Sequence, residues 1–349
     1  AYQEKQLELE RYRSSIERIS HLPAETVDGH SVAVQANLEL LEEVVPARDH
    51  GAEGIGLYRT EFLYLRSKGA PSERELFEDY KELAEIVAPA PVTIRTLDLG
   101  GDKFSSDLNL TKEMNPALGL RAIRFCLREP KIFKSQLRAI LRASVHGNVR
   151  LLFPMISGLQ EILDTKKILR DVKKELNKRK IKYARDIKVG IMIEIPSAVA
   201  MADALAKHVD FFSIGTNDLI QYALAIDRIN ETVAYMYQPF HPAILRMIEQ
   251  VVNAAKNAGI RVALCGEMAG DPLCAFILVG LGLDELSMNA QSIPMIKNII
   301  RSISMKEARA DLEHIMQLET AQEVRRYILK RMKPLISELD KKGYYLKVS

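Results

Sequence analysis

The chain has 349 residues, of which 47% are hydrophobic, enough for a large core in two average domains or in one α/β barrel. Its 49 basic and 46 acidic side chains leave a net charge of +3, so composition gives no sign of a nucleic-acid partner. No apolar run is long enough to cross a membrane, no charged-then-apolar leader is present, and the three cysteines suggest no disulfide framework, so we expect a cytoplasmic protein.

The first predicted element is a charged helix over residues 2–19, in which apolar side chains recur at helical spacing among Glu, Arg and Lys. It ends before His21-Leu22-Pro23. We therefore expect a solvated linker helix over residues 1–21 and one large domain over residues 22–349. Because the chain begins at Ala1 rather than Met, we also expect it to be a piece of a longer protein.

Apolar and β-branched runs, separated by stretches of helical patterning, follow along the rest of the chain. The predicted strands are residues 32–37, 54–59, 91–99, 149–155, 188–194, 210–215, 261–266 and 284–288. The predicted helices include residues 38–45, 72–87, 118–143 and 159–178, with terminal helices packed outside from Met305 onward. Eight strands alternating with helices predict an α/β fold, the (β/α)8 TIM barrel, preceded by the linker helix.

In a TIM barrel, catalytic side chains lie at the carboxyl ends of the strands. Polar side chains and a cysteine stand at such ends here, namely Arg59, Arg95, Glu194, Asn217, Asp218, Cys265 and Glu267. Because the apolar pattern alone predicts these strands, the shared position of the polar residues is stronger evidence for a site than any one residue.

Glu194 and Asp218 follow consecutive strands of the predicted barrel. An acid just after a strand is most often a helix cap or a first-turn acid, and that interpretation holds for each residue taken alone. Two carboxylates at one rim, about 5 Å apart at normal strand spacing, repel unless a cation lies between them. As a pair, with Asn217 beside them, they favour a site for Mg²⁺ or Mn²⁺ that keeps positions for substrate oxygens.

Three arginines near the same rim suggest an anionic substrate. Arg59 and Arg95 each follow an apolar run, where an exposed charge is not expected, and Arg228 lies on the segment after Asp218. Guanidinium forks suit phosphate and carboxylate groups because they donate parallel hydrogen bonds. Arg121 and Lys103 are further candidates for binding the same anion, although each also suits a helix surface.

Cys265 differs from the other two cysteines. Cys126 and Cys274 lie within apolar helices and are expected to be small buried hydrophobes. Cys265 opens onto the rim beside glycines, where a thiol is either a nucleophile or a proton donor; spacing does not choose between them. His241 is near the rim, but structural packing is its expected role.

Several motifs in this order resemble the PEP-utilising enzyme family, and within it the PEP-binding part of the Enzyme I branch of bacterial phosphoenolpyruvate:sugar phosphotransferase systems. The motifs are residues 51–62, 100–103, 211–219 and 265–267. By that resemblance, Arg59, Arg95 and Arg228 hold phosphoenolpyruvate with help from Asn217 and the Asp218 backbone. Glu194 and Asp218 ligate the metal, and Cys265 protonates the enolpyruvate carbon.

The resemblance also implies partners. The family carries a phosphorylated histidine on a separate N-terminal domain, which hands the phosphoryl group to the carrier protein HPr, and its PEP-binding half forms a homodimer. Nothing in this chain resembles the histidine segment, and residues 2–19 match the family's connecting helix. Two other interpretations stay open: a module of a pyruvate phosphate dikinase or PEP synthase, and a PEP-sensing dimer without turnover.

Overall fold

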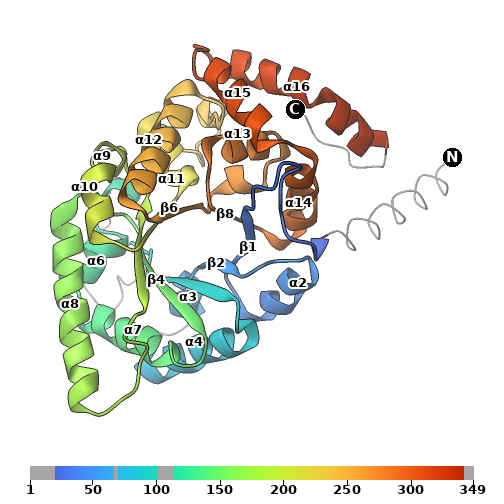
Figure 1. The fold of residues 1–349 in the computed structure, drawn as a ribbon. Helices are drawn as coiled ribbons and strands as arrows, with labels where there is room; N and C mark the ends of the chain where they lie inside the picture. The colour runs from blue at the N-terminus through green and yellow to red at the C-terminus, as the bar shows by residue number, and fades with distance from the viewer. Residues whose placement is uncertain (1–19, 67–69, 101–113, 342–349) are drawn as a thin grey trace.

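Eight parallel strands pair in chain order and close into a barrel in the computed structural model, which describes residues 20–66, 70–100 and 114–341 (Figure 1). The strands are β1 (Ala33–Leu38), β2 (Ile55–Tyr58), β3 (Pro91–Arg95), β4 (Asn148–Phe153), β5 (Lys188–Ile193), β6 (Phe211–Ile214), β7 (Arg261–Leu264) and β8 (Glu285–Met288). β8 pairs with β1 from Ala33↔Glu285 to Ala36↔Met288, which closes the ring. The predicted TIM-barrel fold is confirmed.

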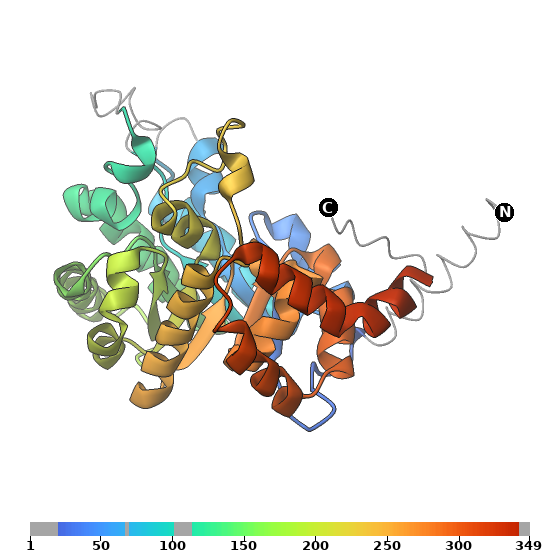
Figure 2. The same cartoon turned by 90° about the horizontal axis from the view of Figure 1, so that it is seen from above.

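Helices surround the strands on the outside of the barrel (Figure 1). They are α2 (Val44–Asp49), α3 (Glu61–Arg66), α4 (Glu73–Val87), α6 (Ala122–Arg128), α7 (Pro130–Ala143), α8 (Leu159–Lys178), α9 (Pro196–Ala200), α10 (Ala202–Leu205), α11 (Thr216–Ala223), α12 (Pro242–Ala258), α13 (Pro272–Leu281), α14 (Ile293–Ser302), α15 (Met305–Ile315) and α16 (Ala321–Lys341). The last two pack on α13 outside the ring, as predicted for the terminal helices (Figures 1 and 2).

Local signals in the sequence begin and end several of these helices. Ser72 opens α4 with a capping box, in which its hydroxyl accepts the Glu75 N–H while the Glu75 carboxylate accepts the Ser72 N–H. Asp271 caps α13 by accepting the N–H groups of the helix's first turn. Gly282 ends α13 with a φ of +84°, a left-handed conformation that glycine adopts without strain.

Several predicted boundaries are wrong, including these three. The predicted strand over residues 91–99 ends at Arg95, because the Leu97 N–H donates to the Gln136 side chain rather than to a neighbouring strand. The predicted helix over residues 118–143 is divided into α6 and α7, with Pro130 in the first turn of α7. The predicted helix over residues 38–45 starts too early, since Leu38 still belongs to β1.

The barrel interior holds a small apolar cluster beneath its carboxyl end. The cluster consists of Leu57, Leu152, Met192, Phe211 and Cys265. At the amino end of the barrel, a group of ion pairs takes the place of apolar side chains. Glu285, whose side chain is 4% exposed, lies 3.0 Å from Arg150 and 3.3 Å from Arg261. An open mouth therefore remains at the carboxyl ends of the strands, where the candidate residues lie.

The first described residues, before β1, are held against the barrel by a buried lysine. The buried Lys297 ammonium group donates to the carbonyl oxygens of Ser20 and Leu22 and lies 2.7 Å from the Glu53 carboxylate. The predicted linker helix and Lys103 lie outside the described residues, so the predicted division at residue 21 stays a prediction. Within the described ranges, no helix combines the length and the apolar character needed to cross a bilayer.

Candidate active site

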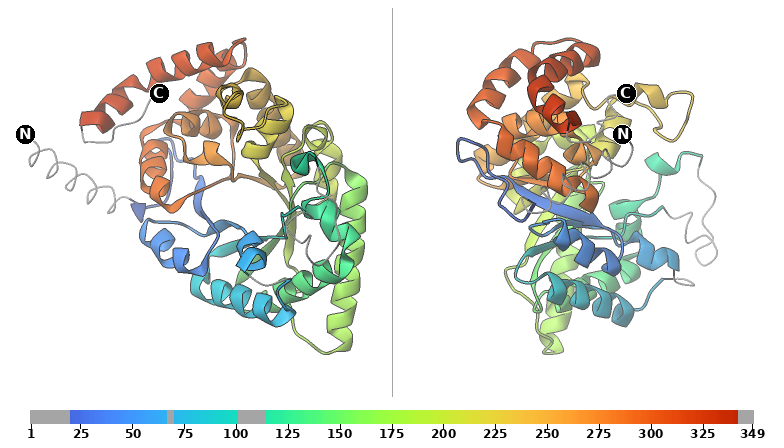
Figure 3. Two further views of the ribbon diagram at one scale, coloured as in Figure 1. Left: turned by 180° about the vertical axis from the view of Figure 1, so that it is seen from behind. Right: turned by 90° about the vertical axis from the view of Figure 1, so that its right-hand side faces the viewer.

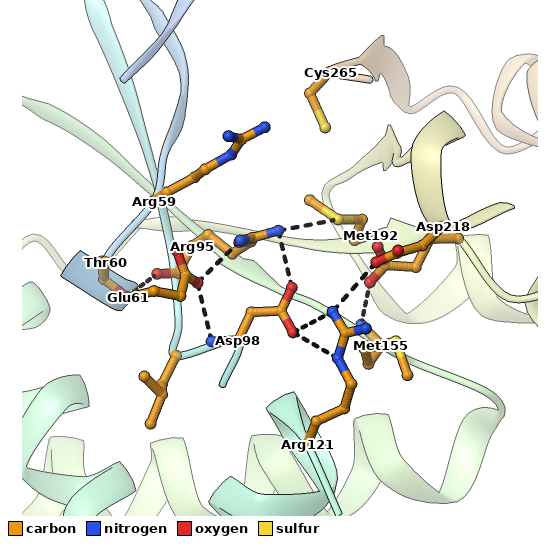
Figure 4. Close-up of polar contacts among 12 residues, drawn as sticks. Arg59, Thr60, Glu61, Arg95, Asp98, Arg121, Met155, Met192, Asp218 and Cys265 are labelled. Carbon is orange, nitrogen blue, oxygen red and sulfur yellow. Dashed lines mark hydrogen bonds and ion pairs between the residues drawn. The ribbon is translucent and has the colours of Figure 1, made fainter. Parts of the chain in front are cut away.

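An arginine pair bridged by one carboxylate occupies the centre of the mouth (Figure 4). Asp98, three residues beyond β3, has one carboxylate oxygen 3.0 Å from Arg95 Nη1 and the other 2.8 Å from Arg121 Nη2. Arg121, the residue before α6, also reaches Asp218 at 3.3 Å and the Tyr222 hydroxyl at 3.3 Å. The Asp98 side chain is only 3% exposed, so the two guanidinium groups are held in fixed positions in a largely water-free region.

A second acid completes the support of Arg95. Glu61, at the start of α3, lies 3.0 Å from Arg95 Nη2, and the same oxygen accepts the Asp98 N–H at 3.0 Å. The buried Arg95 Nε has no partner within the described chain. Since a buried N–H without an acceptor is costly, this donor is suited to an anionic ligand.

Glu194 and Asp218 leave adjacent strands at the same rim. β5 and β6 are parallel, with Ile193 opposite Ile214, so Glu194 directly follows one strand and Asp218 lies in the first turn of α11 after the other. Glu194 is 1% exposed, and its Oε1 accepts the Met155 N–H at 2.6 Å. Burial, followed by the charge of Asp218, raises the pKa of Glu194 well above its ordinary value.

The surroundings of Glu194 fit a divalent cation. In the described part of the chain, no lysine or arginine lies within ion-pair distance of this buried carboxyl; the charges of Asp218 and Asp98 raise its pKa, and the more distant Arg95 only partly opposes them. A Cβ at Gly215 would lie 2.9 Å from Glu194 Oε2, so glycine leaves the room that this oxygen needs. No group of three or more His, Cys, Asp or Glu residues suited to a metal occurs among the described residues, so a cation here would take further ligands from water or substrate.

Backbone strain accompanies these contacts. Met155 and Ala122 have φ values of +57° and +52°, which side-chain-bearing residues rarely adopt. The Met155 N–H faces Glu194, and Ala122 follows Arg121 at the start of α6. Such conformations persist where surrounding contacts impose them, and they occur most often at functional sites.

Arg59 and Cys265 face the space above Arg95 from other strands (Figure 4). Arg59 directly follows β2 and lies 2.8 Å from Glu39, with its side chain 35% exposed. Cys265 directly follows β7, is 3% exposed, and lines with Arg59 a cavity of about 560 Å³ at the mouth. Burial raises the pKa of the Cys265 thiol, so the sulfur holds its proton at neutral pH.

Asn217 and Arg228 form a separate group at the rim. The Asn217 side chain donates to Glu267 Oε1 at 3.0 Å and accepts the Glu267 N–H at 2.8 Å. Arg228 lies 3.2 Å from the same Glu267 oxygen, and its side chain is 38% exposed. Arg228 follows α11 on the segment that runs to η5 (Ala234–Met236), which extends on the same side of the barrel as η3 (Pro116–Leu118) (Figure 3).

The sequence reasoning missed two residues of the centre, Glu61 and Asp98. Asp98 follows Arg95 by three residues and pairs with it, so that spacing was a signal. Glu61 follows Arg59 by two residues but pairs with Arg95, so its role could not be derived from spacing. Asp98 was hidden because the predicted strand ran past it. His241 caps α12, since its Nδ1 accepts the Ala243 N–H, and the structural packing expected of it stays a prediction.

Replacing Asp98 with Asn tests whether this carboxylate holds the arginine pair. Although burial opposes it, the charges of Arg95 and Arg121 hold the pKa of Asp98 below its ordinary value. The stability that Asp98 contributes is therefore present above the ordinary carboxyl pKa of about 4 and is lost as the pH falls through the lower folded value. At pH 7 we expect Asp98→Asn to cost about 2–3 kcal/mol in urea unfolding, with a smaller difference near pH 3.

Asp79 provides the matched control. It accepts a hydrogen bond from Tyr58 at 2.8 Å, and burial raises its pKa to about 6. A carboxylate with a raised pKa does not stabilise the fold when ionised, so Asp79→Asn is expected to leave stability at pH 7 unchanged or slightly higher. Equal losses in the two variants would contradict a specific bridging role for Asp98.

Comparisons with known proteins show which family the chain resembles. The family model described as "PEP-utilising enzyme, PEP-binding domain" matches residues 13–305. A Priestia megaterium protein named phosphoenolpyruvate-protein phosphotransferase is 47% identical over 94% of the chain and 57% of its own length. One of the same name from Geobacillus stearothermophilus is 49% identical over 93% of the chain and 56% of its own length.

The chain thus spans just over half the length of these curated relatives. Among solved structures, a citrate lyase from Burkholderia xenovorans superposes with a TM-score of 0.50 at 15% identity, covering 90% of this chain and 96% of the other. That likeness supports the barrel fold alone.

Proposed function

Because the chain belongs to the PEP-utilising enzyme family, we propose that its barrel mouth binds phosphoenolpyruvate and supports transfer of the phosphoryl group to a histidine on another domain. One observation carries the proposal: Arg95 and Arg121, bridged by the buried Asp98, lie beside the acidic pair Glu194 and Asp218. A ligand with both a phosphate and a carboxylate group, bound together with a divalent cation, satisfies both sets of charges.

Each arginine has a defined part in this proposal. Arg59 and Arg95 bind phosphoenolpyruvate from the ends of β2 and β3, and Arg121 adds to the cationic surface beside Arg95. Arg228 and Asn217 complete the site from the rim when the anion replaces Glu267 as their partner. Asp218 contributes its backbone as well as its side chain.

Glu194 and Asp218 would hold Mg²⁺, or Mn²⁺ in its place, as hard oxygen ligands. When bound, the ion neutralises charge on the phosphate and on the enolate that remains after phosphoryl transfer. The rest of the work belongs to side chains: the guanidinium groups stabilise the charge spread over the phosphoryl oxygens, and fixed positions align the reactants.

Cys265 would complete the reaction. Its thiol gives a proton to the methylene carbon of enolpyruvate, so that the S–H bond breaks, a C–H bond forms, and the enolate oxygen becomes the carbonyl oxygen of pyruvate. The sulfur keeps its electron pair as a thiolate and takes a new proton from water at the mouth. The raised pKa of the thiol keeps the donor protonated at neutral pH.

The relatives' name supports a phosphoenolpyruvate-protein phosphotransferase rather than a dikinase or synthase module. On this proposal the acceptor is a histidine on an N-terminal domain outside this chain, the next acceptor is the carrier HPr, and the barrel forms a homodimer.

Calorimetry on this chain tests the proposal. We expect phosphoenolpyruvate to bind in the presence of Mg²⁺ and to bind far more weakly after EDTA treatment, because two unscreened carboxylates then face the anion. Supplying the histidine domain in trans should release pyruvate. Metal-independent binding would contradict the proposed site, and stabilisation of a dimer by phosphoenolpyruvate without pyruvate release would favour a sensing module instead.

A further inference from the structure

The Cys265 sulfur has a hydrogen-bond partner on the neighbouring strand. Ser213, on β6, donates its hydroxyl to Cys265 Sγ at 3.3 Å, and the thiol in turn donates to the Ile214 carbonyl oxygen at 3.6 Å. Ser213 is 1% exposed and interrupts the otherwise apolar strand Phe211–Ile214. The sulfur is the hydrogen-bond partner of the Ser213 hydroxyl in the described structure.

The surroundings make this hydroxyl important for any charge on the sulfur. Cys265 belongs to the apolar cluster of the barrel interior, with Leu57, Leu152 and Met192. A thiolate in such surroundings loses the hydration that stabilises it in water, so one hydrogen-bond donor has a large effect on its formation. The other hydrogen bond of the sulfur is to the Ile214 carbonyl oxygen, which cannot donate to an anion.

The backbone of Cys265 is held by a different group. Asn37, on β1, donates to the carbonyl oxygens of Cys265 at 2.9 Å and Ser287 at 3.1 Å, and the Ser287 hydroxyl donates to Asn37 Oδ1 at 2.6 Å. Ser287 is also 1% exposed in the barrel. The two serines thus have equal burial, but one contacts the reactive sulfur and the other supports only the main chain.

We propose that Ser213 is a positioning residue for Cys265, whose hydroxyl holds the sulfur at the barrel mouth and stabilises the thiolate left after proton donation. The proposal rests on the proposed function for the direction of proton transfer, and on the 3.3 Å contact for the role of Ser213. Charged groups also act on the sulfur: Arg95 from β3 and Arg59 from the end of β2 favour the thiolate, and Glu194 from the end of β5 opposes it. Glu39 and Glu267 line the adjoining cavity.

The rate of Cys265 alkylation by iodoacetamide, measured against pH, tests the contact on the chain itself. The thiolate is the form that reacts, and mass spectrometry of the Cys265 peptide separates it from the buried Cys126 and Cys274. For Ser213→Ala we expect the midpoint of the curve of alkylation rate against pH to lie about one pH unit higher. That shift corresponds to a tenfold loss of thiolate at a given pH. Ser287→Ala is the matched control with an unchanged midpoint, and Ser213→Thr, which retains a hydroxyl, should keep the original midpoint.

A second readout concerns the reaction. If Cys265 exchanges protons with the pyruvate methyl carbon, the chain should replace the methyl hydrogens of pyruvate with deuterium when incubated with pyruvate and Mg²⁺ in D₂O. Ser213→Ala should slow this exchange about 10-fold or more. A midpoint that moves no further in Ser213→Ala than in Ser287→Ala would overturn the proposal, as would equal exchange in Ser213→Ala and the unaltered chain. Absence of exchange from the unaltered chain would instead count against the proposed role of Cys265.

Discussion

Glu194→Gln is expected to lose Mg²⁺-dependent binding of phosphoenolpyruvate by more than about 1,000-fold. The amide can still accept the Met155 N–H, so the local geometry is kept while the negative charge is removed. Replacing a side chain that only hydrogen-bonds a metal ligand already costs about 10–100-fold in affinity, and replacing a ligand itself costs more. Titration of Mg²⁺ and phosphoenolpyruvate by calorimetry measures the effect.

The same variant should be more stable than the unaltered chain when metal is absent. Glu194 has a raised pKa, so ionising it in the folded protein opposes folding, and that cost grows as the pH rises above its unfolded value. A neutral amide removes the burial cost of the charge and its repulsion by Asp218. In EDTA at pH 7 we expect the melting temperature to rise by a few degrees.

Glu285→Gln is the matched control at the other end of the barrel. As whole residues, Glu285 is 3% exposed and Glu194 is 1% exposed, but Glu285 is paired with Arg150 and Arg261. Removing its charge leaves those arginines without a counter-ion, so this variant should be less stable and bind phosphoenolpyruvate normally. Unchanged Mg²⁺-dependent binding in Glu194→Gln would contradict the metal site.

Cys265→Ala is expected to reduce pyruvate formation by about 10²–10⁴-fold, the range for loss of a general acid. Phosphoenolpyruvate affinity should change less than threefold, because the arginines and acids that bind the anion are untouched. Pyruvate release with the histidine domain supplied in trans measures the loss, and calorimetry measures the affinity.

Cys126→Ala controls for the removal of a buried thiol. Cys126 lies in α6 beneath the site and is 1% exposed, with its sulfur 3.9 Å from the Leu97 carbonyl oxygen. It should leave both pyruvate release and affinity unchanged. Normal turnover in Cys265→Ala would exclude the cysteine as the proton donor, whatever the affinity.

The sequence was sufficient to predict the barrel, because parallel strands buried on both faces appear as apolar β-branched runs. It also placed Arg95, Glu194 and Cys265 at strand ends, where the structure has them. The apolar pattern did not locate the exact end of each strand. Because Leu97 is apolar, the predicted strand extended beyond Asp98, whereas β3 ends at Arg95.

Side-chain pairing across loops was beyond the sequence. Arg121 was expected within a long helix, whereas it precedes α6 and contacts Asp98. Arg228 lies at the rim and pairs with Glu267. Sequence spacing alone did not predict this pairing. Such contacts depend on how loops from different strands meet above the barrel, and no local pattern encodes that arrangement.

Crystals soaked with Mn²⁺ and oxalate, an analogue of the enolate, test the central claim most directly. The anomalous signal of Mn²⁺ distinguishes the metal from water and from lighter ions. We expect an anomalous peak bound by the carboxylates of Glu194 and Asp218, with oxalate oxygens as further ligands and the oxalate facing Arg95. A peak elsewhere, or one without contact to Glu194, would contradict the claim.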